Sequence, residues 1–239
     1  MTGRRTAVAL IPARGGSKRL HRKNVIDFLG RPIIAYTIHA ALAANSFDRV
    51  VVSTEDDEIG SVANSFGATV HRRRSELAAD SAGLVDVCLD YLDQEFSAGR
   101  GWDVLACLYA TAPLRTAEDI RGTLALIDPP TCEFAMAVTV YDHQAHQALR
   151  FSSDGDLAPM WPELVTRRAS DLPMLRASNG STYVVSVPAF RQAKSFYGSR
   201  LKGYDMPRNR SVDIDTSDDL ELALWYARRG ASPPPEEAT

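Results

Sequence analysis

Residues 6–24 read TAVALIPARGGSKRLHRKN, an apolar run followed by a basic loop that contains two adjacent glycines. The run, Thr6 to Pro12, predicts a buried strand because it is short and apolar and ends at a proline and a glycine-containing loop. Gly15 and Gly16 let backbone N–H groups approach an anion, as a phosphate site requires. Cations occupy five positions of the loop: Arg14, Lys18, Arg19, Arg22 and Lys23. A solvated run of charge is the alternative, which the paired glycines and the preceding strand disfavour.

Strand-like and helix-like segments alternate after this loop. Further strands are expected at residues 49–54, 67–70, 103–109, 134–141, 182–187 and 211–214, and helices at 33–44, 56–66, 83–96, 117–127 and 217–228. Alternation with helices of this length implies parallel strands joined by right-handed crossovers. We therefore predict a doubly wound α/β fold with a mostly parallel sheet, which binds its ligand at the carboxyl ends of the strands.

Composition restricts the partners of the protein. The chain has 239 residues and a formal net charge of −3, which disfavours a nucleic-acid partner because such proteins are usually basic. The three cysteines, Cys88, Cys107 and Cys132, have neither disulfide nor metal spacing and are expected to be buried thiols. The apolar run at residues 7–11 is too short for a signal peptide, and no segment reaches membrane-spanning length. We therefore expect a cytoplasmic protein with no membrane partner.

Residues 1–230 are expected to form one domain. Within it, residues 142–177 are polar, carry three prolines and show weak periodicity. This insertion is expected to fold over the site or to pack on another subunit. Residues 231–239 are rich in proline and glutamate, a composition that predicts a disordered tail.

Two aspartates near the carboxyl end of the chain suggest a metal site. Asp213 and Asp215 alternate with Val212 and Ile214 in a segment expected to be a strand. Residues i and i+2 of a strand share a face, so the two carboxylates would point the same way. Paired carboxylates suit Mg²⁺, with Mn²⁺ as the alternative ion. Capping of the following helix by Asp215 is the competing interpretation.

The motifs of this chain resemble those of one known family. The first loop carries ARGGSK and a closing KN, and further motifs are FLGRPIIAYTIHAA (28–41), DRVVVSTED (48–56), RRRSELAADSA (72–82), YATAPLR (109–115), NGSTYV (179–184) and SVDIDTSDDLELA (211–223). Their order and spacing are similar to those of the acylneuraminate cytidylyltransferases, the CMP-sialic acid synthetases, across roughly residues 6–226. The resemblance implies a Rossmann-like nucleotidyltransferase that uses CTP.

The resemblance also assigns roles to the first loop and the aspartates. The nucleotide-binding positions carried over are Ala13, Arg14, Gly15, Gly16, Ser17, Lys18, Lys23, Asn24, Arg73 and Ser81. Arg14 would stabilise charge on the attacked phosphate and Lys23 the departing pyrophosphate, both of which are electrostatic tasks. Asp213 would join Arg14 and Lys23 as a catalytic residue, and Asp213 and Asp215 match the metal-binding aspartates of the family. Arg72 is the alternative to Arg73, because the family varies by one position here.

The positions expected to contact an acidic sugar are Tyr109, Thr111, Gln147, Arg168 and Asn179. Tyr109 and the segment 160–173 look like the pseudaminic acid branch of the family, whereas Asn179 with Tyr183 looks like the sialic and legionaminic branches. Arg168 would clamp the sugar carboxylate bidentately, and Arg167 is the alternative. A turn capped by Thr111 or Thr116 is the other interpretation of the YATAPLR motif. The family also implies a homodimer in which the insertion reaches the partner's site.

The resulting hypothesis is transfer of CMP from CTP to the anomeric hydroxyl of a nine-carbon, sialic acid-like sugar acid, with release of pyrophosphate. Three rival interpretations remain open. One is a cytidylyltransferase for another acid, such as a different 3-deoxy-ulosonate or a phosphonate, and another is a non-catalytic nucleotide-binding descendant. The third is a Rossmann oxidoreductase, which the absence of a G-x-G-x-x-G motif disfavours.

Overall fold

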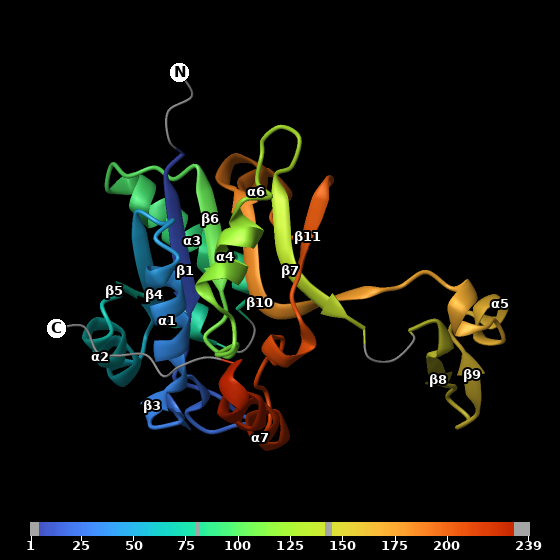
Figure 1. Ribbon diagram of the computed structural model, residues 1–239. Coiled ribbons are helices and arrows are strands. Elements are labelled where there is room, and N and C mark those ends of the chain that lie inside the picture. Colours follow the sequence, from blue (N-terminus) through green and yellow to red (C-terminus); the bar gives the residue numbers. More distant parts are fainter. Residues whose placement is uncertain (1–4, 80–81, 142–144, 232–239) are drawn as a thin grey trace.

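A seven-stranded sheet forms the body of the computed structural model, which describes residues 5–79, 82–141 and 145–231 (Figure 1). Its strands are β1 (Ala7–Pro12), β4 (Arg49–Thr54), β5 (Thr69–Arg72), β6 (Val104–Leu108), β7 (Phe134–Val140), β10 (Arg176–Ser186) and β11 (Leu201–Asp205). They lie in the order β11-β7-β10-β6-β1-β4-β5. Every neighbouring pair is parallel except the two pairs that β10 makes. The predicted α/β fold with a mostly parallel sheet is confirmed.

Helices cover both faces of the sheet. They are α1 (Ile33–Ala43), α2 (Asp57–Ser65), α3 (Leu84–Ser97), α4 (Ala117–Leu124) and α6 (Val187–Ala193), and the last helix, α7 (Ser217–Tyr226), lies beyond the edge of the sheet. Along β1, Ala9 and Ile11 pack with α1, α2 and α4, whereas Val8 and Leu10 pack with α3 and α6. Side chains alternate between the faces of a strand, so a strand covered on both sides is apolar throughout. Over the described residues, no helix is both long and apolar enough to cross a membrane.

A third apolar cluster lies where the sheet's ligand edge meets the last helix. Phe28 and Ile33 pack there against Ile214 and Ala223. Two short strands, β2 (Asp27–Phe28) and β3 (Arg31–Pro32), form a hairpin that follows the 3-10 turn η1 (Lys23–Val25). The two-residue turn between them has positive φ at both positions, which a right-twisted hairpin favours. This cluster fixes the end of the first loop against α7.

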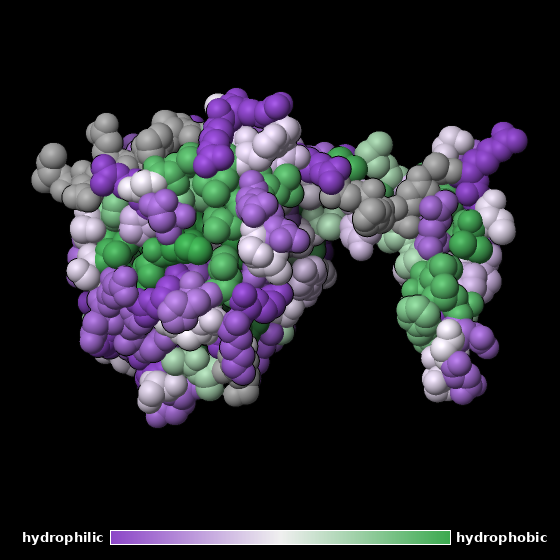
Figure 2. All heavy atoms as spheres, turned by 90° about the horizontal axis from the view of Figure 1, so that it is seen from below, coloured by the Kyte–Doolittle hydropathy of each residue, from purple (hydrophilic) through white to green (hydrophobic). Residues whose placement is uncertain are grey.

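The chain between β7 and β10 leaves the body as an arm (Figure 1). It contains η3 (Ala145–Gln147), β8 (Leu149–Phe151), β9 (Leu157–Pro159), α5 (Pro162–Val165) and η4 (Ala169–Asp171). Figure 2 shows apolar side chains gathered on this arm, at a distance from the body. Residues 142–144 and 232–239, which belong to the expected insertion and tail, lie outside the described residues.

One expected strand is absent from the structure, and two elements of the body were not expected. Residues 211–214 form no strand, although Val212 and Ile214 are buried, because no neighbouring strand makes a ladder of backbone hydrogen bonds with them. Strand β11 was missed because its sequence, LKGYD, is polar and lies at the sheet edge, where one side is exposed. Helix α6 was missed because it is short and follows β10 directly. Burial of the three cysteines is confirmed.

Candidate active site

A cavity of about 550 Å³ opens at the carboxyl ends of β1 and β6. Its polar and charged lining residues are Arg14, Ser17, Lys18, Arg19, Lys23, Asn24, Arg73, Tyr109, Thr111 and Asp215. Residues from four distant parts of the sequence therefore meet at the edge of the sheet where a ligand was expected. The excess of cations suits an anionic ligand.

The first loop is shaped by contacts with β4 and the turn after it. The backbone N–H of Ala13 donates to the carbonyl of Ser53 at 3.0 Å, and that of Gly15 donates to Glu55 Oε1 at 2.7 Å. A Cβ at Gly15 would collide with the Asp56 carboxylate, whereas one at Gly16 would meet nothing within 4 Å. Packing therefore requires the first glycine, and the second leaves open space beside the cavity.

Asn24 and Arg22 fix the end of this loop in different ways. The buried side-chain amide of Asn24 donates to the carbonyl of Arg14 at 2.9 Å, which closes the loop on itself. Arg22 has a left-handed backbone (φ 52°) and donates a fork to Asp56 at 2.6 and 3.2 Å and a further hydrogen bond to Glu58. The hydrogen bond from Arg22 holds the pKa of Asp56 below its usual value. Arg22 therefore stabilises the conformation of the loop and does not line the cavity.

Asp213 and Asp215 have contrasting environments: Asp215 lines the cavity, whereas Asp213 contacts Thr111, which lines it. Asp215 accepts from Lys23 Nζ at 2.7 Å and from Arg19 at 2.8 Å. Burial opposes ionisation of Asp215, but these two cations hold its pKa below the usual value. Asp213 accepts a hydrogen bond from the Thr111 hydroxyl, yet burial, reinforced by the charge of Asp215, raises its pKa. Asp215 is thus already neutralised by two cations, whereas the neighbouring Asp213 would be stabilised in its ionised form by a further positive charge.

These carboxylates fit a divalent cation that a phosphate ligand would help to hold. The described residues contain no group of three or more His, Cys, Asp or Glu side chains able to hold a metal ion. Mg²⁺ typically takes one or two protein carboxylates and completes its shell with phosphates and waters. Lys23 and Arg19 now neutralise Asp215, and both also line the cavity.

Only one member of the arginine triplet faces the cavity. Arg73 is buried, lines the cavity and donates to the carbonyl of Ser53 at 2.6 Å. Burial lowers the pKa of this guanidinium. Arg72 is exposed and pairs with Asp57, so the structure favours Arg73 over Arg72 as a ligand contact. Ser81 lies outside the described residues.

The YATAPLR segment contributes the cavity wall opposite the first loop. Tyr109 lines the cavity, and its ring centroid lies 5.5 Å from that of Tyr183. Burial raises the pKa of the Tyr109 phenol, which keeps it protonated as a hydrogen-bond donor. Thr111 also lines the cavity, but its hydroxyl is committed to Asp213. The capping role belongs to Thr116, which begins α4.

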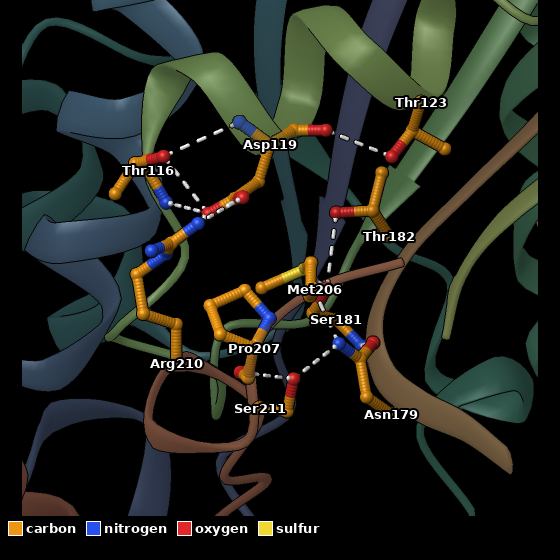
Figure 3. Close-up of polar contacts among 10 residues, drawn as sticks. All are labelled: Thr116, Asp119, Thr123, Asn179, Ser181, Thr182, Met206, Pro207, Arg210 and Ser211. Atoms are coloured by element: carbon orange, nitrogen blue, oxygen red, sulfur yellow. Dashed lines mark hydrogen bonds and ion pairs between the residues drawn. The ribbon is translucent and has the colours of Figure 1, made fainter. Parts of the chain in front are cut away.

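The other expected sugar contacts are not part of this cavity. Asn179 is buried on β10 and donates to Ser211 Oγ at 3.0 Å and to Met206 Sδ at 3.2 Å (Figure 3). Gln147 and Arg168 lie on the arm, where both are exposed. Arg167 also lies on the arm and donates to the carbonyl of Asp171 at 3.3 Å. Within one chain, the structure does not bring the arm residues together with Tyr109 and Thr111.

The sequence reasoning missed Arg115, which supports the cavity wall from behind. Its wholly buried guanidinium donates to the Thr37 hydroxyl at 2.8 Å and to the carbonyls of Ser181 and Tyr109. Burial lowers its pKa to about 10. The available signal in the sequence was a charged residue directly after the apolar run APL. An arginine buried in such a place has five N–H donors and needs several acceptors around it. Arg19, which was noted only as a cation of the loop, also proves to line the cavity.

Comparison with known proteins agrees with this geometry. The sequence profile described as cytidylyltransferase matches residues 8–200. The chain belongs to the cytidylyltransferase family. This cytidylyltransferase is 33% identical over 217 residues to the pseudaminic acid cytidylyltransferase of Campylobacter jejuni, covering 90% of this chain and 94% of that protein. It is 33% identical over 220 residues to the CMP-N,N'-diacetyllegionaminic acid synthase of Legionella pneumophila, covering 90% and 93%.

A solved structure supports the fold of this cytidylyltransferase. The CMP:2-keto-3-deoxy-manno-octonic acid synthetase complexed with CTP superposes with a TM-score of 0.70. The two sequences are 20% identical, and the match covers 94% of this chain and 99% of that one. The expected nucleotidyltransferase-like fold is therefore confirmed, as is the resemblance to the pseudaminic and legionaminic branches of the family.

Proposed function

We propose that this cytidylyltransferase transfers CMP from CTP to the anomeric hydroxyl of a nonulosonic, nine-carbon 2-keto sugar acid and releases pyrophosphate. The observation that carries the proposal is the cavity at the carboxyl ends of β1 and β6, lined by Arg14, Lys18, Lys23 and Arg73. The relatives named above act on acids of this class, which supports the same class of acceptor here.

The cations of the first loop would bind and orient the triphosphate. Arg14 and Lys18 lie on the first loop and line the cavity, so they would meet phosphate oxygens from that side. Lys23 would move from Asp215 to the departing pyrophosphate and stabilise its negative charge. Arg73 and the adjoining loop would hold the cytidine end.

Asp213 and Asp215 would hold Mg²⁺ or Mn²⁺. When bound, such an ion offsets phosphate charge and makes the attacking hydroxyl more acidic. The hydrogen bond from Thr111, a residue of the cavity wall, would hold the Asp213 carboxylate next to Asp215. Tyr109, protonated and at the cavity wall, would donate a hydrogen bond to the acid acceptor.

We infer that the arm acts on the cavity of a second copy of the chain in a homodimer. Its side chains include large apolar groups that are strongly exposed in one chain, such as Phe151 (74%) and Met174 (75%). Exposed apolar area of this kind marks an interaction surface. Arg168 is exposed on the same arm, so association would bring a guanidinium to the partner's acid site. In this arrangement the arm residues expected to contact the sugar would do so in the cavity of the partner, which explains why they lie away from the cavity of their own chain.

Pyrophosphate release tests the proposal directly. Purified protein with Mg²⁺ and CTP is assayed against sialic, legionaminic, pseudaminic and Kdn-type acids, with a 3-deoxy-octulosonate and a phosphonate as the rival acceptors. We expect release with at least one nonulosonic acid, and much less when ATP or GTP replaces CTP. Turnover only with a rival acceptor would mean that the substrate belongs to the class of that acceptor and is not a nonulosonic acid. Absence of pyrophosphate with every acceptor, despite CTP binding, would favour a non-catalytic nucleotide-binding protein.

A further inference from the structure

The segment that carries Asp213 and Asp215 is held without a sheet ladder. Between β11 and α7, residues 206–216 form only a short 3-10 turn, η5 (Arg208–Arg210), and irregular chain. One backbone hydrogen bond ties the segment to the cavity wall, from the N–H of Ile214 to the carbonyl of Thr111 at 2.9 Å. The position of the two carboxylates therefore depends on side-chain contacts, and Figure 3 shows the polar network around this turn.

Arg210 makes a forked ion pair that is one of these contacts. Its Nε donates to Asp119 Oδ2 at 3.0 Å, and a terminal nitrogen donates to Oδ1 at 2.8 Å, so the pair forms a fork (Figure 3). Asp119 lies in the first turn of α4 and is 0% exposed. The Asp119 carboxylate also caps α4, because it accepts from the backbone N–H and the hydroxyl of Thr116.

The capping role does not account for Arg210. Asp219 makes the same capping box with Thr216 at the start of α7, and both of those residues are partly or fully exposed. A capping box needs no arginine and no burial. At α4, by contrast, the carboxylate is buried and pairs with a residue 91 positions away. Burial opposes ionisation of Asp119, and the hydrogen bond from Arg210 is the chief reason that its pKa lies below the usual value.

A second anchor holds the other side of the turn. The Asn179 amide donates to Ser211 Oγ at 3.0 Å, and Ser211 Oγ donates to the carbonyl of Pro207 at 2.9 Å. Asn179 Oδ1 accepts from the N–H of Ser181 at 3.1 Å, which ties the turn to β10. Gly180 has a positive φ of 67°, and a Cβ there would collide with the Asp213 carboxylate. The turn is thus fixed on both sides immediately before Asp213.

We propose that Arg210, through its fork to Asp119, is a positioning residue that sets Asp213 and Asp215 for the divalent cation. Only Ser211 and Val212 separate Arg210 from Asp213, so a shift of the turn moves that carboxylate directly. The inference rests on the proposed function, in which the two aspartates receive Mg²⁺. Groups that orient metal ligands typically change metal affinity by about 10-fold to 100-fold when they are altered.

The test separates metal binding from nucleotide binding. Calorimetry measures the dissociation constant of CTP in Mg²⁺ and in EDTA, without acceptor, for wild type, Arg210→Lys and Asp119→Asn. Lysine keeps the charge but cannot make the fork. We expect the constant in Mg²⁺ to rise by about 10-fold or more in both variants. In EDTA we expect a change below about twofold, because Arg210 does not line the cavity.

Arg100→Lys is the matched control. Arg100 makes the same fork to Glu95, at 2.9 and 2.7 Å, at the end of α3 and away from the cavity. Its variant should leave both constants unchanged. In turnover assays, raised Mg²⁺ should restore kcat to Arg210→Lys, which a general loss of structure would not allow. Circular dichroism and Tm identify any variant that fails to fold, and Asp119→Asn removes the carboxylate charge while keeping one acceptor oxygen at this position.

Two results would overturn the proposal in distinguishable ways. If the folded Arg210→Lys and Asp119→Asn proteins keep the wild-type constant in Mg²⁺, or lose affinity equally in EDTA, Arg210 has only a structural role. If wild type itself binds CTP equally in Mg²⁺ and EDTA and turns over without Mg²⁺, the metal assignment fails and this proposal fails with it.

Discussion

The cavity on the sheet and the arm differ in how completely one chain builds them. At the cavity, Lys23 contacts Asp215 across 192 positions of sequence, and Thr111 contacts Asp213 across 102. The arm carries Gln147 and Arg168 on its surface and leaves Phe151 exposed. A phosphate site can therefore be complete in one chain, whereas in the proposed homodimer the acid site would gain its arm residues only by association. We therefore expect substitutions at the cavity to lower kcat, and substitutions on the arm to raise KM for the sugar acid or to weaken association.

The largest effect is expected at the proposed metal site. Asp213→Asn keeps the volume of the side chain but removes a half-buried carboxylate, so we expect kcat to fall on the order of 10³-fold. Asp215→Asn should show a similar loss. Steady-state pyrophosphate release as a function of Mg²⁺ checks both. Near wild-type turnover with an unchanged Mg²⁺ dependence would remove the metal assignment.

The next effect distinguishes ligand contact from loop fastening. Arg14→Ala should lower kcat by roughly 10²-fold to 10³-fold with little change in Tm, because Arg14 lines the cavity. Arg22→Ala should lower Tm and change kcat far less, because its fork holds Asp56 and Glu58. Parallel kinetics and thermal unfolding give the comparison. Equal small losses in kcat would mean that the loop is only a diffuse positive patch.

A smaller effect is expected on the arm. Arg168→Lys should raise KM for the sugar acid by roughly 10-fold to 100-fold and leave KM for CTP nearly unchanged, since lysine cannot form two parallel hydrogen bonds with a carboxylate. Arg167→Lys is the internal control. A large sugar effect from Arg167→Lys alone would move the assignment by one residue. No effect from either variant would place the carboxylate elsewhere.

Association itself should respond to the apolar surface of the arm. Phe151→Glu introduces a charge where the isolated chain exposes 74% of the side chain, so the fold should be unaffected. We expect sedimentation to show a shift from dimer to monomer and KM for the acid to rise, with CTP affinity retained. A wild-type protein that sediments as a monomer at assay concentration would contradict the partner role of the arm.

The smallest expected effect is a pH dependence of stability. The pKa of Asp119 is lowered in the folded protein, so its ionised form stabilises the fold above the unfolded pKa of about 3.9 and loses this contribution as the pH falls through the folded value. The difference in unfolding free energy between wild type and Asp119→Asn should therefore shrink below about pH 4. Urea unfolding at several pH values measures it. A difference that grows in acid would have the wrong sign.

Sequence patterns were informative where the relevant residues are contiguous. The first strand, its loop and the alternation of Asp213 with Val212 could be read directly, because each depends on neighbours in the chain. The fork between Asp119 and Arg210 could not, since both residues look like surface charges until the fold buries one of them. The sequence likewise predicted that Asn179 contacts the sugar, because it could not show that the Asn179 amide donates a hydrogen bond to Ser211, which lies 32 positions away.

A crystal structure with CTP and Mg²⁺ is the most direct test of the cavity as the nucleotide site. We predict the triphosphate between Arg14 and Asp215, a cation on the aspartates, and Lys23 Nζ moved from Asp215 to a phosphate oxygen. Nucleotide density outside this cavity, or a triphosphate bound there while Lys23 and Arg19 still neutralise Asp215 and no cation is present, would contradict it.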